Sequence, residues 1–275
     1  MTTNSVAESE EKTVEEETKT GNIESHSEQN KTPPIKSTTN IIHDGLYVTI
    51  GSIFVFLFSY AFRIVLSRYL SVEEYGLFYA IWNFLTFFLF FIYLGLDQAS
   101  VHYVVKYKVE NNYGKIKSII LSTLAFQLLT TSIFIVGIFF TARFLEEHYF
   151  RYPGSGQLLM LMSVFLLFNV LGGLSSYVLY GFQRLKVYAF YAPVQAFLYL
   201  TLFLVFWGMG ASLSAPYWTY VATSLVLVLI FLPFSWKAFP FFRHKSTNFW
   251  EVTRQLFSYG LPVILTAISS RLLIQ

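Results

Sequence analysis

The chain has 275 residues, of which 55% are hydrophobic, 20% aromatic and 13% charged. Because about a quarter of the residues in a soluble domain are charged, this composition excludes a soluble globular protein and indicates a polytopic membrane protein. The sequence contains no cysteine, which excludes disulfides, thiolate metal sites and cysteine nucleophiles.

The net charge of +3 is unevenly distributed along the chain. Residues 1–40 contain eight Glu and four Lys, whereas the remaining residues contain 15 Lys and Arg against 8 Asp and Glu. Basic residues beside membrane spans are expected from topology alone, so the positive charge does not indicate a nucleic-acid partner.

Residues 1–42 are predicted to form a disordered, acidic tail. Glu, Ser, Thr and Lys dominate this segment, which therefore has too little apolar surface to offset the chain entropy lost on folding. It also lacks the apolar core of a signal peptide.

Six apolar segments of about 20 residues follow, each long enough to cross the hydrocarbon core as a helix. The predicted helices are 46–66, 77–96, 118–140, 158–180, 189–207 and 216–236. The polar stretch 97–117 is expected to extend the second helix or to lie on the membrane surface, because its valines recur at helical spacing. An all-α fold follows from this pattern.

The turn between the first two helices carries the signature of a helix start. Ser71 can cap the second helix, and Glu74, three residues later, can reach back to the amide of Ser71. We interpret both residues as helix caps.

A seventh helix is predicted to open with Tyr259–Pro262 and to continue to Gln275. The 13 residues after the proline are too few for a complete span of about 20 residues. We therefore expect the sequence to be a fragment or a truncated reading frame, with a short terminal helix as the alternative.

The distribution of basic residues predicts the orientation. The tail and the connections after the second, fourth and sixth helices hold 14 Lys and Arg, whereas the opposite connections and the first helix hold four. The positive-inside rule then places the N-terminus in the cytoplasm and the Ser71 turn outside the cell membrane.

Enzyme motifs are excluded because acidic residues are scarce. Asp44 and Asp97 are the two aspartates of the sequence, so no Asp-x-Asp pair exists, and there is no P-loop. The run 146–148, Glu-Glu-His, is better explained as loop material than as a metal site. We predict no catalytic residue, metal site or cofactor.

Polar residues inside the predicted spans are candidates for function, since they must face protein or a water-filled cavity. They are Arg63, Asn83, Gln127, Asn169, Gln195 and Arg271. Hydrogen bonding between helices explains the four amides as well as cavity lining does. Arg63 could instead extend to the outer head groups, and so could Arg271 if its span ends soon after Gln275.

Several segments resemble a known family. They are Arg63–Gly76, Tyr93–Gln98, Val104–Lys108, Tyr180–Arg184 and Tyr259–Pro262. Over residues 44–275 the chain resembles polysaccharide biosynthesis membrane proteins, the Wzx-type oligosaccharide flippases of the multidrug/oligosaccharidyl-lipid/polysaccharide exporter superfamily.

The resemblance implies two six-helix lobes around a central cavity that opens alternately to each side of the membrane. Residues 43–255 would form the N-terminal lobe, and residues 256–275 would be the first helix of a truncated second lobe. The implied partners are a lipid-linked glycan, membrane lipids and a second lobe or partner chain.

The implied activity is the transfer of undecaprenyl- or dolichyl-linked glycans from the cytoplasmic to the outer leaflet. In such proteins cationic cavity residues hold the lipid pyrophosphate, a role for which Arg63 and Arg271 are the candidates. The full set of candidate cavity residues is Arg63, Asn83, Gln127, Asn169 and Arg271.

Three alternatives remain open. A cation-coupled drug antiporter of the same superfamily should have carboxylates within its spans, and none lies clearly within the predicted helices. A membrane glycosyltransferase should carry acidic residues on outward loops, where only residues 73–74 and 146–147 offer them. The third alternative is a non-transporting membrane subunit.

Overall fold

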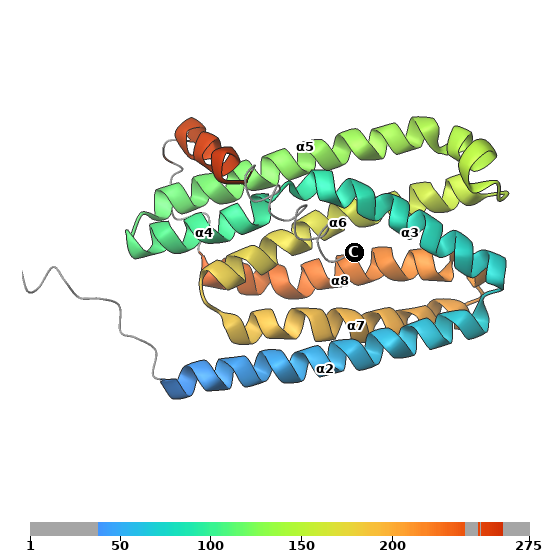
Figure 1. Cartoon of the computed structure of the whole chain (residues 1–275), viewed down its shortest axis with the longest axis horizontal. Helices are drawn as coiled ribbons and strands as arrows, with labels where there is room; N and C mark the ends of the chain where they lie inside the picture. Colours follow the sequence, from blue (N-terminus) through green and yellow to red (C-terminus); the bar gives the residue numbers. More distant parts are fainter. Residues whose placement is uncertain (1–37, 240–246, 248, 261–275) are drawn as a thin grey trace, which may run out of the picture. The chain divides into compact units, whose positions relative to one another are not determined.

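The computed structural model describes residues 38–239, 247 and 249–260 (Figure 1). In this part of the chain the regular elements are helices, without a strand, and six helical segments are long and apolar enough to cross a membrane. The all-α fold and the multi-pass membrane class are therefore confirmed. Residues up to Gly45 and residues from Leu46 onward form separate units, and the following description concerns the second unit.

The helices follow the predicted apolar segments but extend beyond most of them. They are α2 (Thr38–Tyr69), α3 (Val72–Tyr93), α4 (Leu96–Val109), α5 (Tyr113–Leu145), α6 (Ser155–Gly181), α7 (Leu185–Gly208) and α8 (Ala215–Ala238). A π-helical turn, η1 (Glu146–Phe150), continues α5, and a 3-10 turn, η2 (Ser212–Ser214), precedes α8. Most of the predicted tail, residues 1–37, lies outside the described residues.

The α2–α3 turn contains both hydrogen bonds of a capping box. The Glu74 amide donates to Ser71 Oγ at 3.2 Å, and the Ser71 amide donates to Glu74 Oε2 at 2.8 Å. Amides in the first turn of a helix have no partner within the helix, so these two side chains allow α3 to restart directly after α2.

Both ends of helix α6 are capped by side chains from other segments. The Glu146 carboxylate accepts hydrogen bonds from the amides of Gly154, at 2.7 Å, and Gly156, at 3.0 Å. At the other end, Lys108 Nζ donates to the carbonyl oxygen of Phe182 at 3.1 Å. The charges of these side chains complement the helix dipole.

A break separates α3 from α4 within one continuous apolar segment, Val72–Val109. Leu94 and Gly95 both adopt left-handed backbone angles, with φ of 40° and 67°. Leu94 ends α3, and α4 starts afresh at Leu96. The structure thus favours extension of the second predicted helix across residues 97–109.

Helices α6 and α8 form the centre of the bundle. Half of the most apolar stretch of each is buried, compared with 11% in α2 and α7. Helix α6 packs against α3, α4, α5, α7 and α8 (Figure 1). Helix α2 contacts α7 through aromatic pairs, including Phe58 with Phe197 and Phe62 with Phe203.

Residues 249–260 are helical and lie against α4 and α5. Val252 and Leu256 are buried, and Tyr107 Oη donates to Gln255 Oε1 at 2.6 Å. Positions 255 and 256, between which the lobe boundary was predicted, therefore lie in one helix. The rest of the predicted seventh helix, residues 261–275, lies outside the described residues.

Replacing Gly181 by Ala should lower the free energy of unfolding by about 1–3 kcal/mol, the usual cost of overpacking. An added Cβ would lie 2.6 Å from Cγ1 and 3.1 Å from Cβ of Val104. Because valine has little rotamer freedom in a helix, α4 and α6 would have to separate. Thermal unfolding in detergent measures the loss. Gly137→Ala is the control, since its Cβ would meet nothing within 4 Å, and equal loss in both variants would contradict the prediction.

Candidate functional site

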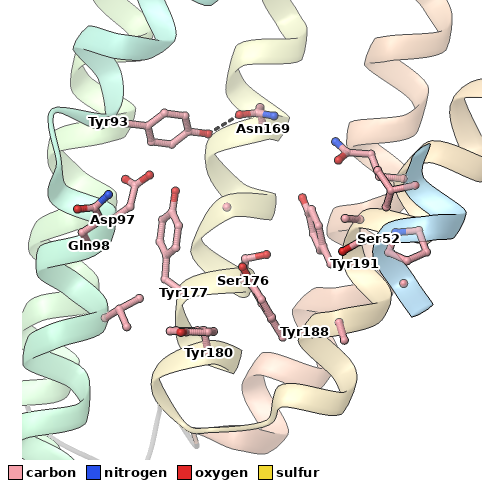
Figure 2. Close-up of a pocket in the computed structure, with 18 of the residues that line it drawn as sticks. Ser52, Tyr93, Asp97, Gln98, Asn169, Ser176, Tyr177, Tyr180, Tyr188 and Tyr191 are labelled. Atoms are coloured by element: carbon pink, nitrogen blue, oxygen red, sulfur yellow. Dashed lines mark hydrogen bonds between the residues drawn. The ribbon is translucent and has the colours of Figure 1, made fainter. Parts of the chain in front are cut away.

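A cavity of about 770 Å³ lies between α2, α4, α6 and α7 and reaches the end of α3. Its walls are rich in hydroxyl and amide groups (Figure 2). The lining tyrosines are Tyr93, Tyr177, Tyr180, Tyr188 and Tyr191. Such groups are costly to bury in lipid, and here they offer hydrogen bonds to a polar ligand from walls whose exposed surface is otherwise mostly carbon.

Helical spacing explains why α6 supplies much of this lining. Asn169, Gly173, Tyr177 and Tyr180 follow one another at intervals of three or four residues, which places them on one face of the helix. Glycine at position 173 leaves room for the phenols, since an added Cβ would lie 3.0 Å from the Tyr177 hydroxyl.

The α3–α4 break brings Tyr93 and Asp97 to the cavity. The Tyr93 hydroxyl donates a hydrogen bond to Asn169 Oδ1, which joins the end of α3 to α6 (Figure 2). Asp97 stands in the first turn of α4, where the helix dipole favours a carboxylate. The Tyr177 side chain points toward that carboxylate from α6 (Figure 2).

Gln127 reaches Asp97 from α5. Its Nε2 donates to Asp97 Oδ1 at 3.2 Å, and the residue is fully buried. Its Oε1 has no hydrogen-bond partner among the described residues, and the same holds for Oγ1 of Thr131, one turn further along α5. Buried oxygens without partners are rare in folded proteins.

Of the predicted cavity residues, Asn169 lines the cavity, whereas Gln127 is buried behind its wall and contacts the lining residue Asp97. Gln195, also a polar residue within a predicted span, lines the cavity from α7. Arg63 and Asn83 are exposed and are not among the described lining residues. Arg271 lies outside the described residues.

Asp97 follows the predicted end of the second helix by one residue, and the structure places it in the first turn of α4. This residue belongs to the 38-residue apolar segment Val72–Val109. The drop in hydropathy after Leu96 suggested a helix end there. Two features of the sequence indicate that the helical segment continues beyond Leu96. The following valines recur at helical spacing, and the small residues Ala99 and Ser100 are buried.

No metal centre of the usual kind is present in the part of the chain that the structure describes, where His, Cys, Asp and Glu form no group of three. Glu146 caps α6, and Glu147 forms an ion pair with Arg143 at 3.2 Å. These contacts give both glutamates structural roles.

An apolar groove of about 90 Å³ adjoins the cavity between α2 and α7. It shares Gly51, Ala189 and Pro193 with the cavity and is otherwise lined by Ile50, Phe54 and Phe190. A polar chamber and an apolar groove therefore meet at these two peripheral helices.

Comparison with known proteins gives one family and one relative. A family model described as polysaccharide biosynthesis protein matches residues 41–275. An uncharacterized membrane protein of Methanocaldococcus jannaschii is 28% identical over 233 residues, which cover 78% of this chain and 45% of the relative. The chain thus spans about half the length of the curated relative that it matches. No solved structure matches the chain.

Tyr93→Phe should lower the free energy of unfolding by about 1 kcal/mol, because it removes the donor to Asn169 Oδ1. In a double-mutant cycle, Asn169→Leu should cost less in the Tyr93→Phe background than in the wild-type chain. Tyr60→Phe on the exposed face of α2 serves as the control. Strictly additive effects of the two substitutions would show that the hydrogen bond contributes nothing.

Proposed function

Because the chain belongs to the polysaccharide biosynthesis protein family, we propose that it forms part of a transporter that moves lipid-linked oligosaccharides or polysaccharide precursors from the cytoplasmic to the outer leaflet. The single observation that carries this proposal beyond the family is the polar cavity between membrane-spanning helices. On this proposal the protein is not an enzyme.

The main energetic barrier to the proposed transport is the movement of the polar sugar through the membrane. Each hydroxyl that enters hydrocarbon without a hydrogen bond costs several kcal/mol. A cavity lined by phenols and amides offers replacement hydrogen bonds, and its aromatic rings offer flat faces for packing. The lining therefore suits a glycan head group.

The cavity suits the sugar better than the pyrophosphate. None of the described lining residues is Lys or Arg, and Asp97 adds a carboxylate that would repel an anion. The predicted pyrophosphate-binding residues, Arg63, which is exposed on α2, and Arg271, which lies outside the described residues, therefore remain a proposal that the cavity itself does not support.

The proposed direction of transport agrees with the position of the cavity. It lies where α3 ends and α4 begins, along the last third of α6 and near the start of α7, which is toward the cytoplasmic side if the basic residues face the cytoplasm. The proposed location is the cell membrane, with a cytoplasmic N-terminus. Transport would then proceed by rocking of this lobe against a second one around the bound glycan.

A cation-coupled antiporter for small molecules is the second candidate function. The observation that favours it is Asp97 within an apolar segment, since intramembrane carboxylates often serve ion coupling. The two candidates differ in the transported molecule and can be separated by transport assays.

Liposome transport with the purified protein tests the proposal directly. A polyprenyl-diphosphate oligosaccharide with a fluorescent sugar should become accessible to a membrane-impermeant quencher beyond its outer-leaflet fraction. Ser176→Trp, which places a large side chain in the cavity, should abolish this movement. Leu204→Trp on the exposed side of α7 should not. Extrusion of a cationic dye without movement of the labelled lipid would favour the antiporter.

Arg271→Ala should lower glycan export in cells about tenfold or more, as expected from the loss of a charged hydrogen bond. The amount of protein in the membrane, measured by immunoblot, should stay the same. Arg143→Ala is the control, because this side chain is exposed and pairs with Glu147. Normal export by Arg271→Ala would exclude Arg271 from pyrophosphate binding.

A further inference from the structure

We propose that the cavity favours uncharged sugars that are rich in hydrogen-bond donors, and that it discriminates against acidic sugars that carry a carboxylate. This inference rests on the proposed function and adds to it the chemical class of the glycan. Two features carry it, the direction of the hydrogen bonds beside the α3–α4 break and the charge of the cavity lining.

The hydrogen-bond donors beside the α3–α4 break are already used within the protein. The Tyr93 hydroxyl donates to Asn169 Oδ1, and the Tyr177 hydroxyl is hydrogen-bonded to the Asp97 carboxylate (Figure 2). From behind the wall, Gln127 Nε2 donates to the same carboxylate at 3.2 Å. A phenol has a single proton to donate, whereas its oxygen can still accept. The oxygens of Tyr93 and Tyr177 are therefore left to act as acceptors toward a ligand.

Two glycines of α6 allow the phenol oxygens to approach one another. A Cβ added at Gly173 would lie 3.0 Å from the Tyr177 hydroxyl and 3.5 Å from the Tyr93 hydroxyl. A Cβ added at Gly172 would lie 2.8 Å from the Tyr191 hydroxyl. Phenols from α3, α6 and α7 thus converge on one short stretch of α6. A ligand at this point meets several acceptor oxygens at once, so it binds best when it can donate.

The functional groups of sugars differ in their ability to donate. Each sugar hydroxyl, and the N–H of an acylated amino sugar, can donate a hydrogen bond, whereas an ionised carboxylate can only accept. A neutral sugar therefore matches the acceptors around Asp97. A uronic acid brings a further acceptor to the same place and leaves acceptor oxygens of the protein unpaired, which is costly.

The charge of the lining acts in the same direction. Asp97 is the one acidic side chain among the described lining residues, and none of these residues is Lys or Arg. Two negative charges repel more strongly inside a protein than in water. His102 also lines the cavity, but its ring stacks on Tyr259 with a centroid distance of 4.6 Å. An acidic sugar would therefore meet a like charge without an ion-pair partner from the described lining.

Liposome transport with two matched lipids tests the proposal. Each lipid is a polyprenyl diphosphate with one sugar, either a hexose or the hexuronic acid that differs from it only by a carboxylate at C6. Both sugars carry the same neutral fluorophore at C4, and a membrane-impermeant quencher reports their movement. At a pH of about 8, histidine is neutral and carboxylates are ionised. The purified protein should then move the hexose lipid at least about tenfold faster, as expected for a like charge at a binding site.

Asp97→Asn should lower this ratio of rates at least about threefold, because it removes the negative charge and introduces a donor while it keeps the side-chain shape. The ratio is the quantity to compare, since the diphosphate, the polyprenyl chain and any general loss of transport affect both lipids. Glu110→Gln changes an exposed carboxylate outside the lining and should leave the ratio as in the wild-type protein.

Ala192→Lys provides a second test that does not depend on the folding of Asp97→Asn. Ala192 lines the cavity from α7 and is exposed, so a lysine at this position adds a positive charge without displacing a buried side chain. It should raise the movement of the hexuronic acid lipid relative to the hexose lipid.

Equal movement of both lipids by the wild-type protein would overturn this inference and leave the proposed transport intact. The same conclusion follows if the ratio keeps its wild-type value in Asp97→Asn or Ala192→Lys while that variant still moves the hexose lipid. If neither lipid moves with the wild-type protein, the proposed transport itself fails, and the inference about the sugar fails with it.

Discussion

Every polar group that enters the hydrocarbon of a membrane needs a partner inside the protein. At helix ends, where backbone groups have no partner within the helix, side chains from the turns supply one. Ser71 and Glu74 complete the start of α3, Glu146 completes the start of α6, and Lys108 completes its end. Three of the charged residues beside the apolar segments therefore cap helices, which keeps long apolar segments close together along the chain.

The cavity is where the same requirement is left partly unmet. Tyr93 and Asn169 satisfy each other, whereas Gln127 keeps an oxygen without a partner among the described residues. A protein gains nothing in stability from such an atom. The proposal for a glycan rests instead on the hydroxyl and amide groups that line the cavity.

The length of the apolar segments was sufficient to predict the helices, and the spacing of Ser71 and Glu74 was sufficient to suggest the cap. The cavity could not be predicted in this way, because it depends on which faces of α2, α4, α6 and α7 meet. Asp97 was missed because hydropathy falls where α3 ends, although the segment continues. The exposure of Arg63 and Asn83 could not be predicted either, since polarity within a span does not indicate which way a side chain faces.

The apolar groove between α2 and α7 has a consequence for the lipid carrier. If a glycan occupies the polar chamber, its lipid can leave sideways past Ile50, Phe54 and Phe190 and remain dissolved in the bilayer. The protein would then contact only the isoprene units nearest the phosphate. Carriers that differ in total chain length should therefore be transported equally well. Selectivity would depend on the sugar and on the isoprene units nearest the phosphate.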